Sequence, residues 1–265
     1  MPKRRTKGIF MPEEKITIRN NSGENLKGIF HKCGTEMKIV IVCHGFTSTK
    51  EHKLVKGICS ALEKKGTNSF RFDFSGKGES QGEFGKSTYT KEAKDLEAVL
   101  DYFGHVGFET PCVAGHGMGG VVALMQAAND RRIESAIDIA GITYPERIIE
   151  RFGKDLVEKC MREGEAGYMK GGKKFVLKKE FFDDALKMDL FHTIKKVNVP
   201  VLFVYGEKDG EVPLSQMQKL FEKAYQPKGL KVFDDANHSF TKKEHLKEAS
   251  ELCATWAARQ AMAKQ

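Results

Sequence analysis

One short segment of this sequence could present a nucleophile, although the attacking atom is absent. Residues 115–120 read Gly-His-Gly-Met-Gly-Gly, which matches the Gly-x-Ser-x-Gly turn at every position except its centre. In that turn a strand passes sharply into a helix and exposes a serine hydroxyl that attacks a carbonyl carbon. Gly117 stands at the serine position. The segment therefore predicts the strand-turn-helix geometry of a nucleophile without its hydroxyl.

A carboxylate and a histidine follow this turn in the order that nucleophilic catalysis would need. Asp209 lies in the loop 206–213, and His238 lies in the loop 234–240. Each loop follows a short apolar segment, and either residue alone would more often be a turn former or an inert side chain. The order nucleophile position, acid, histidine is nevertheless that of one known triad arrangement. It predicts His238 as a general base that Asp209 orients.

Two backbone segments could stabilise negative charge on a carbonyl oxygen. The segment His44-Gly45-Phe46 follows an apolar strand, and a turn there can aim an amide N–H at a developing oxyanion. Met118, one residue past the centre of the glycine turn, would offer a second amide at a helix N-terminus. The glycine-rich turn alone could instead bind a phosphate. The acid and the histidine in the expected order favour acyl chemistry.

The elements that position these loops are predicted by alternating short apolar segments and longer segments with helical periodicity. Strands are expected at residues 15–19, 26–31, 38–43, 68–72, 111–114, 133–139, 201–205 and 230–233. Helices are expected at residues 52–65, 90–103, 118–128, 214–224 and 242–259. The first two strands mix polar and apolar residues, which favours a hairpin at a sheet edge. The alternation predicts an α/β fold with a mainly parallel sheet, helices on both faces, and the chemical loops at the carboxyl ends of the strands.

Residues 142–189 interrupt this alternation. They are charged, contain several glycines and lack strong strands. Because they lie between two core strands, we expect an inserted cap or lid over the carboxyl edge of the sheet, with a core of residues 1–141 and 190–265. A disordered excursion is the alternative, but disordered segments are usually poor in aromatic residues. This segment contains Tyr144, Phe152, Tyr168, Phe175, Phe181 and Phe182.

From these motifs the chain resembles the α/β-hydrolases of the serine aminopeptidase-like branch, close to the feruloyl or cinnamoyl esterases. The resemblance covers roughly residues 14–256. It is carried by His44-Gly45-Phe46, Asn237-His238 and residues 71–80, 115–120 and 206–213. The resemblance implies an α/β-hydrolase fold with a mainly parallel eight-stranded sheet, helices on both faces and an inserted cap.

The same resemblance implies roles for individual residues. Asp209 and His238 would be the triad partners, and the amides of Phe46 and Met118 would form the oxyanion hole. Gly45 and His116 would contact the substrate, a small-molecule ester or acyl compound under the cap. No metal or organic cofactor is implied.

The departure from this pattern is Gly117. Without a side-chain oxygen no acyl-enzyme can form at this position, and loss of a triad nucleophile costs on the order of 10⁶ in turnover in a protease example. Glycine tolerates a strained backbone best, so the fold should be nearly untouched. Two functions stay open: a carboxylic ester hydrolase inactivated by replacement of its serine, and a natural non-hydrolytic homologue that binds or transforms a small molecule. A water activated by His238 could give slow hydrolysis.

The composition bears on nucleic-acid binding, membrane insertion and the cellular compartment. The net charge of +8 comes from basic residues interleaved with acids, which favours a solvated surface over a nucleic-acid site. No segment approaches the roughly 20 apolar residues of a membrane helix, and the basic residues 2–7 favour a flexible tail over a targeting signal. The six cysteines form no CxxC pair, which is typical of a protein in the reducing environment of the cytoplasm. The sequence makes no prediction of oligomeric state.

Overall fold

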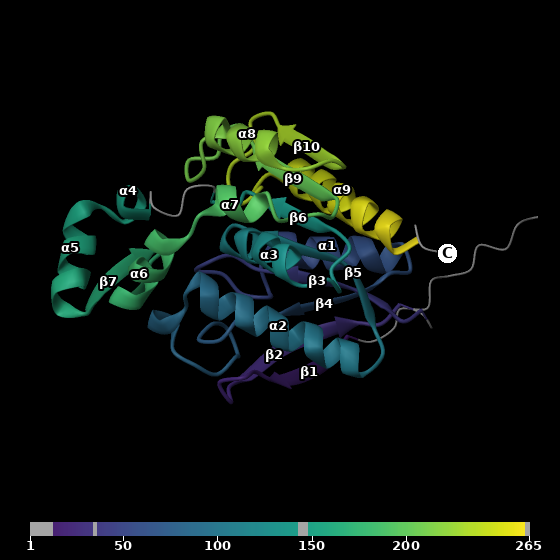
Figure 1. Ribbon diagram of the computed structural model, residues 1–265, viewed down its shortest axis with the longest axis horizontal. Helices are drawn as coiled ribbons and strands as arrows, with labels where there is room; N and C mark the ends of the chain where they lie inside the picture. The colour runs from purple at the N-terminus through teal and green to yellow at the C-terminus, as the bar shows by residue number, and fades with distance from the viewer. Residues whose placement is uncertain (1–12, 34–35, 143–147, 263–265) are drawn as a thin grey trace, which may run out of the picture.

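One eight-stranded sheet runs through the molecule (Figure 1). The structure is a computed structural model of the 265-residue chain and describes residues 13–33, 36–142 and 148–262. The strand order is β1-β2-β4-β3-β5-β6-β9-β10. The strands are β1 (Glu14–Arg19), β2 (Asn25–His31), β3 (Lys38–Cys43), β4 (Asn68–Phe72), β5 (Glu109–His116), β6 (Ala136–Ile139), β9 (Val201–Gly206) and β10 (Lys228–Phe233). The predicted eight-stranded sheet is confirmed.

The sheet is parallel except at one edge. From β4 through β3, β5, β6 and β9 to β10, each strand pairs in parallel with its neighbour. At the other edge β1 pairs antiparallel with β2, and β2 pairs antiparallel with β4. This is the expected edge hairpin. The strand predicted at residues 133–139 is shorter than expected, because Ile133 makes only an isolated bridge to Thr110 before β6 begins.

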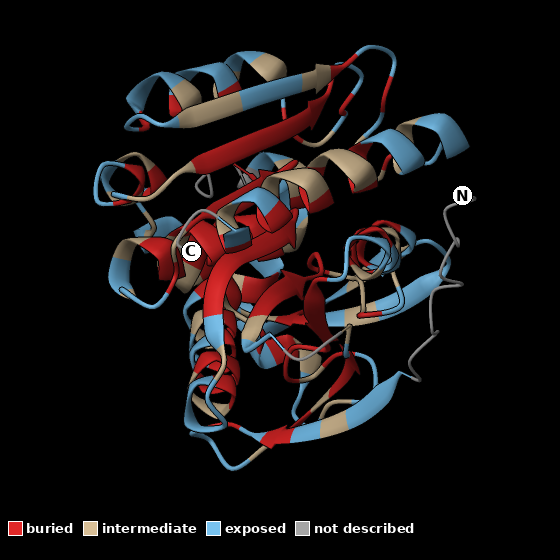
Figure 2. Ribbon diagram, turned by 90° about the vertical axis from the view of Figure 1, so that its right-hand side faces the viewer, coloured by how far each residue is buried: buried red, intermediate tan, exposed pale blue. Residues whose placement is uncertain are grey.

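Helices cover both faces of the sheet, as predicted. They are α1 (Lys53–Lys64), α2 (Tyr89–His105), α3 (Met118–Asn129), α7 (Leu190–Ile194), α8 (Leu214–Lys223) and α9 (Lys243–Met262), with the short 3₁₀ turn η1 (Phe84–Lys86). Residues of α1 and α9 belong to one buried apolar cluster, and residues of α2, α3, α7 and α8 belong to the other. Figure 2 shows the buried strands between helices whose outer faces are exposed. Burial of apolar surface on both faces of the sheet stabilises this arrangement.

The inserted segment folds as helices around a β-hairpin. It contains α4 (Ile148–Phe152), α5 (Lys154–Glu163), β7 (Glu165–Lys170), β8 (Lys173–Lys178) and α6 (Lys179–Lys187). The expectation that this segment lacks strong strands is wrong, since β7 and β8 pair antiparallel over six residues each. Gly171 and Gly172 join them with φ of 57° and 74°, the positive values that a tight two-residue hairpin turn requires. Both strands are largely exposed, so their apolar alternation is weak.

Aromatic side chains attach the insertion to the core beside η1 and α2. Phe181 of α6 stacks on Phe46 with ring centroids 4.7 Å apart, and Phe175 lies 4.7 Å from Phe84. Phe152 packs edge-on against Tyr168 at 4.8 Å. Tyr144 and the basic residues 2–7 lie outside the described residues. Figure 1 places α4, α5, β7 and α6 together at one end of the molecule.

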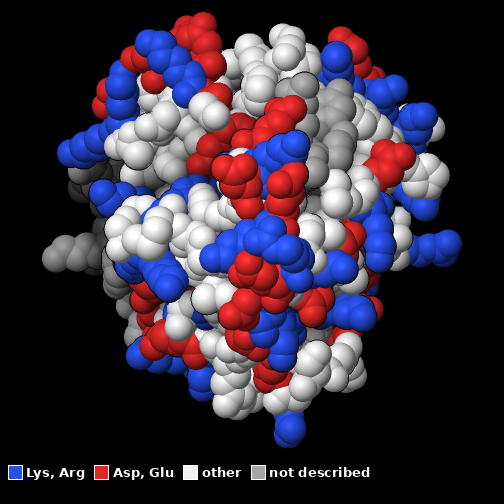
Figure 3. Space-filling model, turned by 90° about the vertical axis from the view of Figure 1, so that its left-hand side faces the viewer, with Lys and Arg blue, Asp and Glu red and all other residues white. Residues whose placement is uncertain are grey.

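The surface carries both signs of charge. On the face that bears the insertion, Lys and Arg side chains alternate with Asp and Glu (Figure 3). Within the described ranges, no helix combines the length and the apolar character needed to cross a membrane. Five of the six cysteines are buried free thiols, and Cys33 is partly buried.

Candidate active site

The glycine turn has the sharp geometry that the sequence predicts. Gly117 lies between the last residue of β5 and the first residue of α3, with φ of 56° and ψ of −121°. A Cβ on Gly115 would lie 2.0 Å from the carbonyl oxygen of Gly119. A Cβ on Gly119 would lie 2.5 Å from the carbonyl oxygen of His44. Strand and helix therefore approach so closely that only glycine fits at these two flanking positions.

The Gly115→Ala variant should lose stability as a result. The added methyl group would meet backbone rather than a flexible side chain, so we expect a cost at the upper end of overpacking, about 3 kcal/mol, and a melting temperature lower by roughly 10 °C. Gly210→Ala is the matched control, because a Cβ there meets nothing within 4 Å. Thermal unfolding followed by circular dichroism measures both. Equal melting temperatures for the two variants would contradict the close strand–helix contact.

Gly117, by contrast, has room for a side chain. A Cβ built on it would lie 3.5 Å from Nε2 of His238 and 3.8 Å from Cα of Gly45. Both are ordinary contact distances. A hydroxyl one bond beyond that Cβ would come within hydrogen-bond reach of the imidazole. The site therefore has the space and the direction for the hydroxyl that the sequence lacks.

His238 and Asp209 meet at this position from two different loops. Asp209 follows β9 and His238 follows β10, and Nδ1 of His238 lies 2.9 Å from Oδ2 of Asp209. The Asp209 side chain is fully buried. Its Oδ1 accepts hydrogen bonds from the amides of Glu211 at 2.8 Å and Val212 at 3.0 Å. A carboxylate fixed in this way accepts a hydrogen bond from the Nδ1–H of His238, and Nε2 then faces Gly117.

The two segments expected to hold an oxyanion both lie next to Gly117, since Cα of Gly45 is 3.8 Å from its Cβ position and Met118 is the next residue. Met118 is the first residue of α3, and the carbonyl of Gly117 accepts the amide of Gly120 at 3.0 Å as that helix begins. Gly45 lies against His116, since a Cβ on Gly45 would be 3.3 Å from Nδ1 of that histidine. The Phe46 ring turns away into the aromatic contacts with the insertion.

His116 packs against His238, with the two ring centroids 4.9 Å apart. Its Nε2 is 2.9 Å from the carbonyl oxygen of His238, and its ring stacks in parallel on His52 with centroids 5.0 Å apart. Burial, together with the nearby His238 and His52, lowers the pKa of His116 well below its usual range. A neutral His116 can donate its Nε2 proton to that carbonyl. Sequence reasoning missed His52, which no motif singles out.

A second cluster that the sequence did not predict joins the insertion to His238. Oε2 of Glu211 lies 3.5 Å from Nε2 of His238. Arg151 of α4 and Lys170 of β7 contact the same carboxylate, at 2.7 Å and 2.9 Å. Burial acts to raise the pKa of Glu211, but the charges of His238 and Arg151 hold it below its usual range. The only signal in the sequence was the place of Glu211, two residues after the acid.

A buried acid also lies at the carboxyl end of β6. The Tyr205 hydroxyl is 2.7 Å from Oδ2 of Asp138 and 2.8 Å from the carbonyl oxygen of Gly141. Burial raises the pKa of Asp138 to about 7. The signal for this acid in the sequence is an aspartate inside an otherwise apolar strand.

The Asp138→Asn variant should reveal this raised pKa. Between an unfolded pKa of about 4 and the folded value of about 7, the folded chain holds a proton that the unfolded chain has lost, so the parent loses stability as pH rises through this window. Asparagine does not titrate. The melting temperature of Asp138→Asn relative to the parent should therefore increase from pH 5 to pH 8. A difference that stays constant over this range would contradict the raised pKa.

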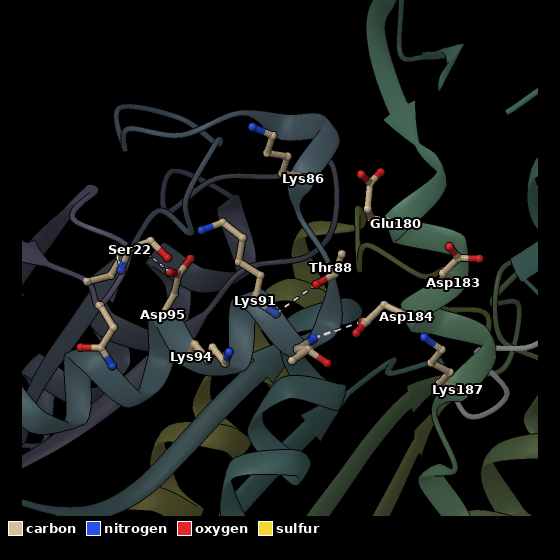
Figure 4. Close-up of a pocket in the computed structure, with 13 residues that line it drawn as sticks. Ser22, Lys86, Thr88, Lys91, Lys94, Asp95, Glu180, Asp183, Asp184 and Lys187 are labelled. Atoms are coloured by element: carbon tan, nitrogen blue, oxygen red, sulfur yellow. Dashed lines mark hydrogen bonds between the residues drawn. The ribbon is translucent and has the colours of Figure 1, made fainter. Parts of the chain in front are cut away.

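A cavity lies on the seam between the insertion and α2, away from His238. Its volume is about 520 Å³, and it is lined by both signs of charge, including Lys91, Lys94, Glu180 and Asp183 (Figure 4). Asp184 of α6 accepts the amide of Thr90 at 3.1 Å there, close to the start of α2. None of the residues expected to act in catalysis lines this cavity.

Two family models match consecutive parts of the chain. The serine aminopeptidase (S33) family matches residues 34–163, and the dienelactone hydrolase family matches residues 182–264. Among curated proteins, the uncharacterized protein YqkD of Bacillus subtilis (strain 168) is 25% identical over 245 residues, which are 89% of this chain and 76% of YqkD.

Solved structures share the architecture over nearly the whole chain. Est1E from Butyrivibrio proteoclasticus with bound ferulic acid has a TM-score of 0.79 at 23% identity, covering 93% of this chain and 99% of its own. The α/β-hydrolase GrgF from Penicillium sp. sh18 has a TM-score of 0.78 at 18% identity, with 93% and 99% covered. The chain has the α/β-hydrolase fold. The esterase domain of a Rhodothermus marinus protein is also similar, with a TM-score of 0.72 at 24% identity and 94% and 99% covered.

Along this chain of α/β-hydrolase fold, the two family matches stop short of one another within residues 142–189. The first ends with α5 and the second begins within α6. The β7–β8 hairpin lies in the unmatched part. Lys170, one of the two cations beside Glu211, therefore comes from the segment that neither family model describes.

Proposed function

We propose that this α/β-hydrolase carries the site of a carboxylic ester hydrolase that lacks only its nucleophilic hydroxyl. Asp209 and His238 are its acid and base, and the amides of Phe46 and Met118 are its oxyanion hole. One observation carries the proposal: a Cβ at Gly117 lies 3.5 Å from Nε2 of a histidine whose Nδ1 is held by a buried carboxylate. Gly45 and His116 complete the wall of the site.

With a hydroxyl at position 117 the chemistry would proceed by acyl transfer. Nε2 of His238 takes the hydroxyl proton while the oxygen attacks the ester carbonyl, and the amides stabilise the tetrahedral oxyanion. The imidazolium then returns the proton to the leaving alcohol. Water repeats these steps on the acyl-enzyme and releases the acid.

With glycine the covalent step has no acceptor atom. The remaining route is direct attack on the ester by a water that His238 activates. This route lacks the acyl-enzyme intermediate, which would divide hydrolysis into two easier steps. We therefore expect the chain with Gly117 to be inactive or very weak toward esters. The substrate class is a small acyl or aryl ester, which is supported by the similarity to Est1E with ferulic acid and to other esterases. Residues 142–189 serve as the lid over a core of residues 1–141 and 190–265.

The experiment is a paired assay of the chain and its Gly117→Ser variant on a panel of short p-nitrophenyl and aryl-acid methyl esters. Activity in the serine variant that the glycine form lacks is the expected result. A folded serine variant that hydrolyses no member of the panel would contradict the proposal.

A natural non-hydrolytic homologue is the second candidate. It is favoured by the position of Glu211, whose carboxylate lies 3.5 Å from Nε2 of His238 and pairs with Arg151. A serine codon at position 117 in the source gene would mark the glycine as an introduced change and exclude this candidate. With a native glycine, a ligand retained through purification and lost in His238→Ala would support it.

A further inference from the structure

Three charged side chains meet where the insertion touches the triad histidine. Arg151 forms an ion pair with Glu211 of the acid loop, with Nη2 at 2.7 Å from Oε2, and Nζ of Lys170 donates a hydrogen bond to Oε1 at 2.9 Å. The side chains of Glu211 and Arg151 are 26% and 18% exposed, so the cluster is partly withdrawn from water. The guanidinium also lies 5.7 Å from the centroid of the Phe152 ring. The cluster thus links two residues of the insertion, Arg151 and Lys170, to Glu211 of the core.

The cluster contains two cationic side chains but only one carboxylate. Among the residues that the structure describes, Arg151 and Lys170 form ion pairs with Glu211 alone. Together they offer eight N–H donors to the two oxygens of one carboxylate. Within the cluster two cations face one carboxylate, an excess of one positive charge, and the neighbouring Asp209 carboxylate is already held by Nδ1 of His238 and two backbone amides. In a partly desolvated site such a charge attracts an anion more strongly than it would in water.

This charge lies next to the place where a ligand would react. Oε2 of Glu211 and the Cβ position of Gly117 are each 3.5 Å from the same nitrogen, Nε2 of His238. The Cβ position of Gly117 is therefore no more than about 7 Å from Oε2 of Glu211, the sum of the two 3.5 Å distances. Glu211 itself shows that a carboxylate fits there.

We propose that Arg151 and Lys170 form a carboxylate-binding subsite beside His238, so that the ester bound here carries a second, free carboxylate. Glu211 pairs with both cations in this structure, and the free carboxylate of the ligand competes with it for the same donors. The proposal rests on the proposed function only in placing the ester group over Gly117. Because the excess charge is one, a singly charged ligand such as the half-ester of a short dicarboxylic acid fits best.

The test is calorimetric titration of the chain with Gly117, which needs no turnover. The probes are monomethyl succinate, glutarate and adipate, each compared with its neutral dimethyl ester. We expect at least one half-ester to bind about tenfold or more tightly than its diester, as hydrogen bonds to a charged group predict. Arg151→Ala and Lys170→Ala should each bring the two affinities close together. Lys174→Ala is the matched control, an exposed lysine of the same hairpin, and should keep the preference.

A Glu211→Gln variant separates this subsite from a mere latch between insertion and core. Removal of the competing charge should raise half-ester affinity several-fold. A preference that is absent, or that survives Arg151→Ala and Lys170→Ala, would overturn the subsite, as would a Glu211→Gln variant with no gain in affinity. An inactive Gly117→Ser variant alongside an intact, Arg151-dependent preference would instead refute the esterase function and leave the subsite standing.

Discussion

Gly117→Ser is expected to hydrolyse short p-nitrophenyl esters at least ~10³ times faster than the chain with glycine, out of the roughly 10⁶ that a triad nucleophile contributes. The new Cβ would sit 3.5 Å from Nε2 of His238 without displacing any neighbour, so its hydroxyl meets a base that is already oriented. The positive φ of 56° at this residue costs the serine on the order of 1 kcal/mol. That cost is small beside the gain in rate.

The matched control for this variant is Gly117→Ala, which adds the Cβ without the oxygen. It should remain as inactive as the glycine form, because contact with His238 alone supplies no nucleophile. Stopped-flow release of p-nitrophenol should show a burst approaching one equivalent in Gly117→Ser if deacylation is slower than acylation. A folded Gly117→Ser variant no faster than Gly117→Ala would show that the site is not an assembled hydrolase site.

Asp209→Asn, introduced into the Gly117→Ser variant, should lower kcat by about 10⁴. The Asp209 side chain is fully buried, and its Oδ2 lies 2.9 Å from Nδ1 of His238. Because the amides of Glu211 and Val212 hold the other oxygen, asparagine would keep its acceptor on that side and present its NH₂ group to Nδ1. That favours the tautomer in which Nε2 carries the proton and cannot act as a base.

The control for this change is Asp234→Asn, which neutralises an exposed aspartate shortly before His238. It should leave kcat within about twofold, since exposed single charges contribute little. Measurements of kcat on one ester for both variants decide the matter. A loss of less than about tenfold in Asp209→Asn would mean that Asp209 does not orient the histidine.

The sheet and the loops at its carboxyl ends could be predicted because their signals are local. An apolar strand such as β3 is nearly fully buried in parallel pairing, and that burial appears directly in the sequence as a continuous apolar segment. The glycine turn was predictable for a related reason. Strand and helix approach so closely at Gly115 and Gly119 that the residue type itself reports the geometry.

The cluster around Glu211 could not be predicted in the same way. Arg151, Lys170 and Glu211 lie in three separate segments of the chain, and tertiary packing of the insertion brings them together. The β7–β8 hairpin was missed because its strands bury few side chains and so show little alternation. Asp138 was missed because burial, rather than a sequence motif, raises its pKa, although the hydrogen bond from the Tyr205 hydroxyl acts to lower it.

The most direct measurement is the intact mass of the Gly117→Ser variant after reaction with diisopropyl fluorophosphate. An oriented His238 should make the introduced hydroxyl a nucleophile, so we expect one covalent phosphoryl adduct per chain. No adduct should form on the parent with Gly117 or on the double variant Gly117→Ser/His238→Ala. An unmodified Gly117→Ser variant, or an adduct that persists without His238, would contradict a hydrolase site that lacks a single hydroxyl.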